Sequence, residues 1–396
     1  MNTFSRQIVS GLCLLGVAAA GLRAAEEPAA VPPAAVPPAA AERAALPTPR
    51  PMVQMAILLD TSGSMDGLID QARTQIWKLV NDFAKSKRAG QTPILQVALY
   101  HYGNNGLPRG TGHVGQLVPL STDLDKISEE LFKLRTNGGE EYCGWAIKTA
   151  VEELKWSDRK GDLKVIFIAG NEPFSQGPVD FRAACKAAIA KGIIVNTIHC
   201  GPADTGEATG WKEGADLADG RYMTIDQNRQ VVRIAAPQDK EIAELGAKLN
   251  TTYVAFGAAG KEARERQEKA DKAAAAAPEV NAQRQLAKAG EQYRNSAWDL
   301  IDALKEKTVK LEELKDEQLP EELRKVKPED RAKWLAEKQK EREELQARIK
   351  KLAEEREKFV AEERKKQAAG GADTLDAAMI KAVREQAAKN GFEYKE

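Results

Sequence analysis

The sequence predicts an α/β fold with a doubly wound, mostly parallel sheet, followed by a largely helical C-terminal arm. Between residues 52 and 258, short apolar runs alternate with longer segments whose apolar residues recur every three or four positions. The short runs are apolar throughout, as in strands that helices cover on both faces. After residue 258 the composition changes to Lys, Glu, Arg and Ala, without strand patterns. A sheet domain and a helical arm therefore follow one another.

The first 24 residues have the layout of an export signal. Arg6 precedes an apolar stretch over residues 8–22, and small residues suited to cleavage follow. An uncleaved membrane anchor is the alternative, although the stretch is short for a spanning helix and Ser10 interrupts it. No later segment is apolar enough to span a membrane. We therefore expect an exported protein, periplasmic or extracellular, without a membrane span once the signal is removed.

Residues 25–51 are rich in proline and alanine, which predicts an extended, semi-rigid linker. In the domain that follows, at 52–258, the predicted strands are 52–60, 94–103, 113–120, 163–170, 193–201 and 251–257. The predicted helices are 67–86, 122–134, 144–156, 179–192 and 239–250. Ligand sites on such sheets lie at the carboxyl ends of the strands. Asp60, Gly170 and Cys200 stand at those ends, so the loops that follow them should share one edge.

The loop after the first strand carries oxygen side chains at even spacing. Asp60 offers a carboxylate, and Ser62 and Ser64 offer hydroxyls, with Gly63 between them to let the chain turn. Hard oxygen donors suit Mg²⁺, Mn²⁺ or Ca²⁺. Three side chains do not complete the coordination shell of such an ion, so other loops at the same edge must contribute.

The segment ILLDTSGSM resembles the Asp-x-Ser-x-Ser signature of von Willebrand factor type A domains, and the resemblance extends over residues 52–258. It implies a metal-ion-dependent adhesion site that binds Mg²⁺ and captures an acidic residue of a partner protein. Through NGGEEYCG, FIAGNEPFSQGPVD and AIAKGIIVNTIHCG, the whole chain is similar to exported bacterial proteins of this class that carry a charged helical C-terminus. That subgroup implies an architecture but no activity.

Two loops depart from the family pattern. Where the family has a threonine after a glycine pair, this chain has Glu140 and Glu141, and where the family has the third-loop aspartate, it has Gly170. Three readings stay open. Glu141 reaches the ion and replaces the aspartate; Asn171 or Glu172 fills in from the neighbouring position; or only the shape of the loop survives. The predicted metal ligands are Asp60, Ser62, Ser64, Glu141 and Asn171.

Three cysteines remain after removal of a signal that contains Cys13. A Cys143–Cys200 disulfide would fix the second metal loop, and Cys185–Cys200 is the rival pairing. Three buried, unpaired thiols are the third possibility, because free cysteine is common in protein cores.

Residues 259–369 predict charged helices, broken by prolines, of which the last is about 60 Å long at 1.5 Å per residue. Its apolar residues have coiled-coil spacing, but basic residues fall on the same stripe; the two sets are Leu345, Ile349, Leu352 and Phe359, and Lys338, Arg342 and Arg356. A coiled coil that self-associates and a helix lying on its neighbours both stay open. Residues 372–396 predict a short amphipathic helix that docks on the domain or on a partner.

The sequence excludes some functions and ranks the others. With 59 basic and 59 acidic residues the net charge is zero, which argues against nucleic-acid binding. No nucleophile or acid/base arrangement stands out, so we expect no enzyme. The favoured function is metal-dependent protein binding or adhesion at the cell envelope. A metal-independent scaffold acting through the helical arm is the alternative.

Overall fold

The computed structural model describes residues 50–226, 234–366 and 375–394. The predicted export signal, and all of the predicted linker except its last two residues, lie outside these ranges. The described residues form one compact unit, so the helices of the arm and the sheet domain belong together. No helix among the described residues is long and apolar enough to cross a membrane.

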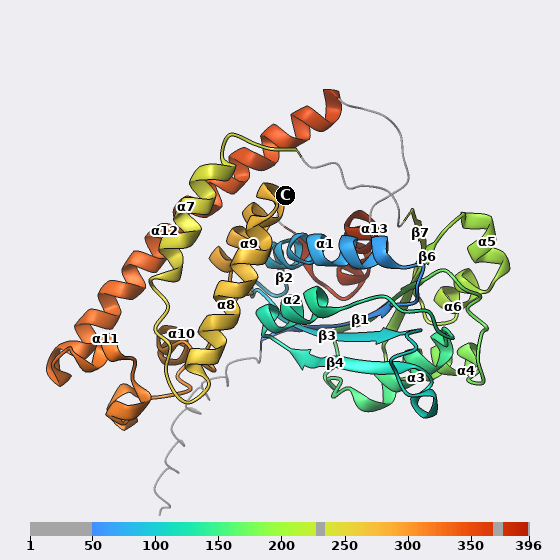
Figure 1. The fold of residues 1–396 in the computed structure, drawn as a ribbon, viewed down its shortest axis with the longest axis horizontal. Helices are drawn as coiled ribbons and strands as arrows, with labels where there is room; N and C mark the ends of the chain where they lie inside the picture. The colour runs from blue at the N-terminus through green and yellow to red at the C-terminus, as the bar shows by residue number, and fades with distance from the viewer. Residues whose placement is uncertain (1–49, 227–233, 367–374, 395–396) are drawn as a thin grey trace, which may run out of the picture. The chain divides into compact units, whose positions relative to one another are not determined.

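A six-stranded sheet is the centre of the fold (Figure 1). Its strand order is β4-β3-β1-β5-β6-β7, and only the edge strand β4 runs antiparallel to its neighbour. The strands are β1 (Met52–Asp60), β3 (Ile94–Tyr102), β4 (Val114–Ser121), β5 (Leu163–Gly170), β6 (Ile194–Cys200) and β7 (Tyr222–Ile225). This arrangement confirms the predicted mostly parallel, doubly wound sheet. The strand predicted at 251–257 does not join the sheet; there Ala255 only bridges to Asp299.

Helices cover both faces of the sheet (Figure 1). Alternate residues of β1 enter two separate hydrophobic cores: Met55 and Ile57 one, Ala56 and Leu58 the other. The first core receives α1 (Asp66–Ala84), α2 (Leu124–Lys133) and α13 (Leu375–Lys389). The second receives α3 (Cys143–Glu153), α4 (Phe181–Ala190) and α6 (Trp211–Asp216), with α5 (Ala203–Ala208) beside it.

The helices that follow the sheet pack on its first core or form smaller cores of their own. They are α7 (Asp239–Asn250), α8 (Gly260–Ala275), α9 (Pro278–Ala289), α10 (Leu300–Lys305), α11 (Glu321–Arg324) and α12 (Arg331–Lys366). Short 3-10 turns lie at Arg109–Thr111, Leu311–Glu313, Asp316–Gln318 and Pro328–Asp330. Residues of α8 and α9 share the core of the sheet face, so no boundary at residue 258 separates an independent domain from the arm.

The long helix α12 packs on α7 and α9 of its own chain. The apolar stripe with coiled-coil spacing faces these helices: Ile349 and Leu352 are buried. Arg342 and Arg356 on that stripe are buried as well, whereas Lys338 is partly exposed. Arg342 forms two hydrogen bonds with Asp299, of 2.7 and 3.0 Å, and Arg356 pairs with Asp239 at 2.5 Å. These cations anchor α12 within the chain, so the stripe that predicted a coiled coil is already covered. Whether the arm also self-associates stays a prediction.

A buried ion cluster joins α9 to α2 and α8. Arg284 is fully buried; its Nη1 lies 2.6 Å from Asp125 Oδ1 and its Nε 2.5 Å from Asp271 Oδ1. Lys288 donates to Asp271 at 2.9 Å, and Tyr293 donates to Asp125. Two cations and two carboxylates therefore balance inside the protein, and the arm is held to the sheet domain by groups that cannot be separated without leaving a buried charge unpaired.

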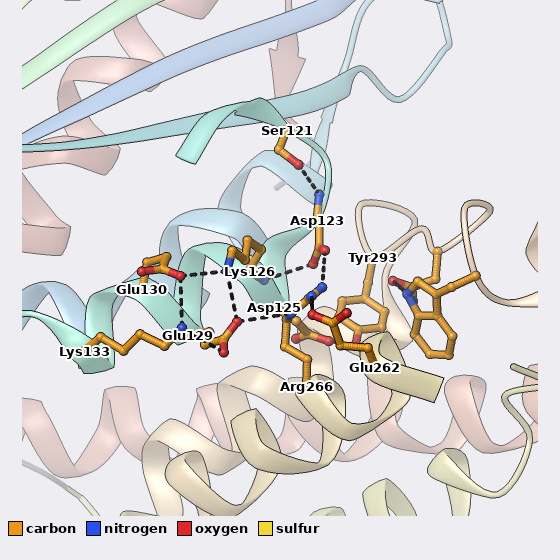
Figure 2. Close-up of polar contacts among 12 residues, drawn as sticks. Ser121, Asp123, Asp125, Lys126, Glu129, Glu130, Lys133, Glu262, Arg266 and Tyr293 are labelled. Carbon is orange, nitrogen blue, oxygen red and sulfur yellow. Dashed lines mark hydrogen bonds and ion pairs between the residues drawn. The ribbon is translucent and has the colours of Figure 1, made fainter. Parts of the chain in front are cut away.

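A second, more exposed contact joins α2 to α8 (Figure 2). Arg266 of α8 reaches Asp123 at 2.8 Å and Glu129 at 3.1 Å, both on the side of α2 that faces it. Asp123 also caps α2, since its side chain accepts from the Lys126 backbone N–H. The same carboxylate thus caps the N-terminus of α2 and binds α8.

Acid should weaken the attachment that the buried cluster of Arg284, Lys288 and Asp271 makes. Burial alone would raise the pKa of Asp271, but the charges of Arg284 and Lys288 outweigh burial and lower it from 3.8 to about 2. A folded-state pKa below the unfolded one means that the stabilisation is complete above pH 3.8 and is lost as the pH falls through that window. We expect a loss of about 2 kcal/mol in the free energy of unfolding. Urea titrations at pH 5.5 and pH 2.5 should show a smaller pH effect in Asp271→Asn than in wild type; equal effects would contradict the assignment.

The C-terminal helix α13 docks on the domain, as one of the two sequence readings proposed. Ala382, Val383 and Phe392 are buried in the first core, against α1. Gln386 exchanges hydrogen bonds with Asn196 of β6, and the chain ends with β8 (Glu393–Tyr394) paired to β2 (Ser86–Lys87). The helix that completes this face of the sheet therefore comes from the far end of the sequence.

Candidate metal-binding site

In the first loop, one carboxylate oxygen of Asp60 accepts a hydrogen bond and the other has no partner. Asp60 is fully buried at the carboxyl end of β1, and its Oδ1 accepts the Ser62 backbone N–H at 2.7 Å. Its Oδ2 is buried without a hydrogen-bond partner. Ser62 Oγ and Ser64 Oγ lie 3.3 Å apart, so the two hydroxyls converge as the motif predicted. The loop is fixed by the second loop, because Asn137 N–H donates to the Thr61 carbonyl at 3.0 Å.

Glu141 of the second loop lies against Asp60. Each carboxyl group affects the pKa of the other, and the Ser62 hydroxyl lies close enough to affect both. Its backbone N–H donates to Gln176 Oε1 at 3.0 Å, which ties the second loop to the third. Glu141 Oε2 is buried and has no hydrogen-bond partner. A side chain on Gly103 would fall 2.7 Å from Glu141 Cγ and 2.8 Å from Asp60 Oδ1, so a glycine there makes room for the pair.

Two adjacent buried carboxyl groups do not both ionise readily. Burial raises the pKa of Asp60, and burial together with the neighbouring Asp60 raises the pKa of Glu141 to about 9. At neutral pH the pair therefore retains a proton between them. A divalent cation supplies the positive charge that would let both groups ionise.

The third loop lacks a carboxylate at Gly170, and the structure shows why. A side chain there would fall 2.5 Å from the Tyr102 hydroxyl and 3.0 Å from Asp60 Oδ2. Tyr102 donates that hydroxyl to the Ala169 carbonyl at 3.0 Å, so it is fixed in place. Directly after Gly170, Asn171 carries a buried Oδ1 without a hydrogen-bond partner. Glu172 is close enough for its charge to raise the pKa of both Asp60 and Glu141.

Placing at position 170 the aspartate that the family has there should therefore destabilise the protein. We expect Gly170→Asp to destabilise it by about 1–3 kcal/mol through overpacking against Tyr102, without strengthening ion binding. Thermal unfolding and ion titration check both parts. Gly110→Asp is the matched control, since nothing lies within 4 Å of a side chain there. Tighter ion binding by Gly170→Asp at unchanged stability would refute this explanation.

The cysteines do not form the disulfide considered from the sequence. Cys143, Cys185 and Cys200 are free and buried. Cys143 and Cys185 belong to the core on one face of the sheet, and Cys200 belongs to the core on the other, so the sheet stands between Cys143 and Cys200. Of the three possibilities, the structure shows buried thiols. Burial also raises the pKa of Cys143, which disfavours a reactive thiolate.

The residues at this edge fit a hard divalent cation. Asp60, Glu141 and Asn171 each have a buried side-chain oxygen without a partner, and buried polar atoms normally have one. Within the described ranges no group of three or more His, Cys, Asp or Glu side chains could hold a metal ion. The donor set here is instead two carboxylates with hydroxyl and amide oxygens, which suits Mg²⁺, Mn²⁺ or Ca²⁺ better than a soft metal.

The sequence singled out Asp60, Glu141 and their neighbours as metal ligands, which stays a prediction, but it did not single out the residues that hold these loops. Tyr102 and Gln176 hold the second and third loops, and neither stood out because single polar residues at strand ends or in loops carry no spacing signal. The resemblance drew attention to Glu141, Gly170 and Asn171. It could not show that Tyr102 occupies the space beside Gly170.

The fold is a doubly wound sheet, and side-chain oxygens gather at the carboxyl ends of its strands. Both features are expected of a von Willebrand factor type A domain. In sequence, residues 54–233 match the von Willebrand factor type A domain, and this part of the chain is such a domain. The matched range ends before α7, so α13 completes the sheet face from outside it. No curated protein matches the chain in sequence.

Solved structures of the same class resemble the domain at low sequence identity. BatB from Bacteroides thetaiotaomicron is 17% identical over 56% of this chain and 99% of its own, with a TM-score of 0.34. The pilus adhesin SpaC from Lactobacillus rhamnosus GG is 15% identical over 45% of this chain and 28% of its own, with a TM-score of 0.34. Proximal thread matrix protein 1 from the mussel byssus, with a zinc-occupied adhesion motif, is 14% identical over 46% and 43%, with a TM-score of 0.34. The chain spans less than half of the adhesin and mussel structures.

Proposed function

We propose that this protein is a metal-dependent protein-binding or adhesion module at the cell envelope. The observation that carries the proposal is the pair of facing carboxyl groups, Asp60 and Glu141, each with a buried oxygen that lacks a partner, beside the hydroxyls of Ser62 and Ser64. Asn171 offers a third such oxygen. Mg²⁺, Mn²⁺ or Ca²⁺ bound by these groups would form a metal centre at the carboxyl edge of the sheet, where an oxygen of a partner protein could complete its coordination shell.

An exported location is part of the proposal. It rests on the export signal and linker read from residues 1–51 and on the type A domain that follows. The linker would separate the domain from the membrane at which export takes place. We propose binding rather than catalysis, because no nucleophile or acid/base arrangement stands out in the sequence of these loops.

The alternative, a metal-independent scaffold acting through the arm, has less support. The apolar stripe of α12 that would bind a partner helix already packs on α7 and α9. Arg342 and Arg356 on that stripe are paired with carboxylates of the same chain. A scaffold would have to use the charged outer face of α12.

Affinity capture from an envelope extract tests the proposal. Immobilised full-length protein should retain a partner with Mg²⁺ and release it with EDTA. Asp60→Asn should retain nothing, whereas Asp204→Asn, an exposed carboxylate on α5, should behave as wild type. Capture that is unchanged by EDTA and by Asp60→Asn would support the scaffold instead.

A further inference from the structure

The loops around the site are strongly acidic. Residues 60–66, 103–113, 134–142 and 170–180, all described by the structure, contain six carboxylates, two guanidinium groups and no lysine. The acidic residues are Asp60, Asp66, Glu140, Glu141, Glu172 and Asp180, and the basic ones are Arg109 and Arg135. If all the carboxylates ionise, a bound divalent cation only halves the net charge of minus four. An approaching carboxylate would therefore meet a negative surface.

The acidic residues of these loops divide into buried and exposed ones. Asp60 is fully buried and Glu141 is 5% exposed, so these two face the ion position. Glu140 and Asp180 are exposed and Glu172 is partly exposed. The basic residues compensate little: Arg109 is 83% exposed and 4.0 Å from Glu140. Arg135 donates two hydrogen bonds to backbone carbonyls at the C-terminal end of α2.

Two aromatic side chains lie next to the exposed acidic residues of these loops. Tyr142 directly follows Glu141, and its ring is stacked on Trp145 with centroids 6.4 Å apart. Both rings are partly exposed, and the Tyr142 hydroxyl donates to Glu140. Exposed Tyr and Trp faces attract the charged ends of Lys and Arg, and they are enriched where binding energy concentrates.

We propose that this edge binds a basic, Lys- or Arg-rich segment of a partner protein rather than a partner's carboxylate. The cationic side chains pair with Glu140 and Glu172 and lie on the Tyr142–Trp145 rings. A neutral oxygen of the same segment, a backbone carbonyl or a hydroxyl, would complete the shell of the ion, because Asp60 and Glu141 would already balance its charge. Removal of the ion would therefore cost the partner one of its contacts. This inference rests on the proposed function and names the chemistry of its partner, which differs from the acidic capture that the family resemblance implies.

Mn²⁺-loaded protein tests the first half of the inference. Electron paramagnetic resonance reports whether Mn²⁺ binds, and water-proton relaxation reports whether added acetate displaces water from the bound ion. We expect no displacement by millimolar acetate in wild type and clear displacement in Glu141→Thr, where the second carboxylate is gone. Displacement in wild type overturns the inference but leaves the proposed function intact. Failure of Mn²⁺ to bind overturns both.

Short peptides test the second half. Tetralysine should bind the Mn²⁺-loaded full chain, and tetraglutamate should not, in a calorimetric titration at low salt. The double variant Glu140→Gln/Glu172→Gln should weaken tetralysine binding about fivefold, since each surface pair contributes modestly. Glu343→Gln/Glu344→Gln, on the exposed side of α12, is the matched control and should bind as wild type. Tighter binding of tetraglutamate, or equal loss in the two double variants, contradicts the inference.

Discussion

A chain that ends at Lys366, without α13 and β8, is expected to lose most of its stability. Removal of α13 uncovers the first core, where Val383 is fully buried and Met379 and Phe392 are buried too. Each large apolar side chain contributes roughly 1.5–3 kcal/mol when buried. Three of them approach the whole stability of an ordinary domain, about 5–15 kcal/mol. Urea unfolding of the truncated and full chains measures the difference.

Point variants in α13 show whether the truncation acts through the loss of core packing. Val383→Asp places an unpaired charge in the core and should reproduce much of the effect, whereas Lys381→Asp, exposed on the same helix, should not. Unfolding of the truncated chain at the same urea concentration as the full chain would contradict this role for α13. A chain that ends near residue 258 should not fold alone, because that cut also removes α8 and α9 from the same core.

Arg284→Ala is expected to lower the free energy of unfolding by about 3–5 kcal/mol, the range for breaking a buried ion pair. Arg284 is fully buried between Asp125 and Asp271, and without it both carboxylates lose their main partner. The guanidinium also lies 4.8 Å from the Trp77 ring, so packing is lost along with charge.

Arg348→Ala is the control for this prediction. Arg348 pairs with Glu241 at 2.6 Å, but both side chains are 46% exposed, and such pairs contribute under about 1 kcal/mol. Chemical denaturation of both variants gives the comparison. Equal and small effects would show that the buried cluster does not hold the arm to the domain.

Local patterns predicted the fold because its strands follow the rules closely. Strands β1 and β5 are almost wholly apolar, and the sheet buries them on both faces. The motif placed Asp60, Ser62 and Ser64 at the strand end, where the structure has them. The predicted strand at 251–257 failed because its apolar residues Val254 and Phe256 pack with α10 and α11 in a separate core. Apolar alternation alone cannot tell such a segment from a strand.

Long-range pairings could not be predicted from the sequence. Arg342 and Arg356 resembled defects in a coiled-coil stripe, and only the fold brings Asp299 and Asp239 to them. The Cys143–Cys200 pairing was conceivable because both residues lie near one edge, but they face opposite sides of the sheet. Likewise, the reason for Gly170 is the hydroxyl of Tyr102, a residue 68 positions away in the chain.

The central claim is that Glu141 and Asp60 together hold a divalent cation. A titration of Mn²⁺ followed by electron paramagnetic resonance tests it most directly, on wild type, Asp60→Ala, Glu141→Gln and Glu140→Gln. Glu140 is the matched control because it is adjacent to Glu141 but exposed. We predict one bound Mn²⁺ per chain in wild type and Glu140→Gln, no binding in Asp60→Ala, and binding weakened by about tenfold or more in Glu141→Gln. Wild-type affinity in Glu141→Gln, with binding abolished in Asp60→Ala, would contradict it.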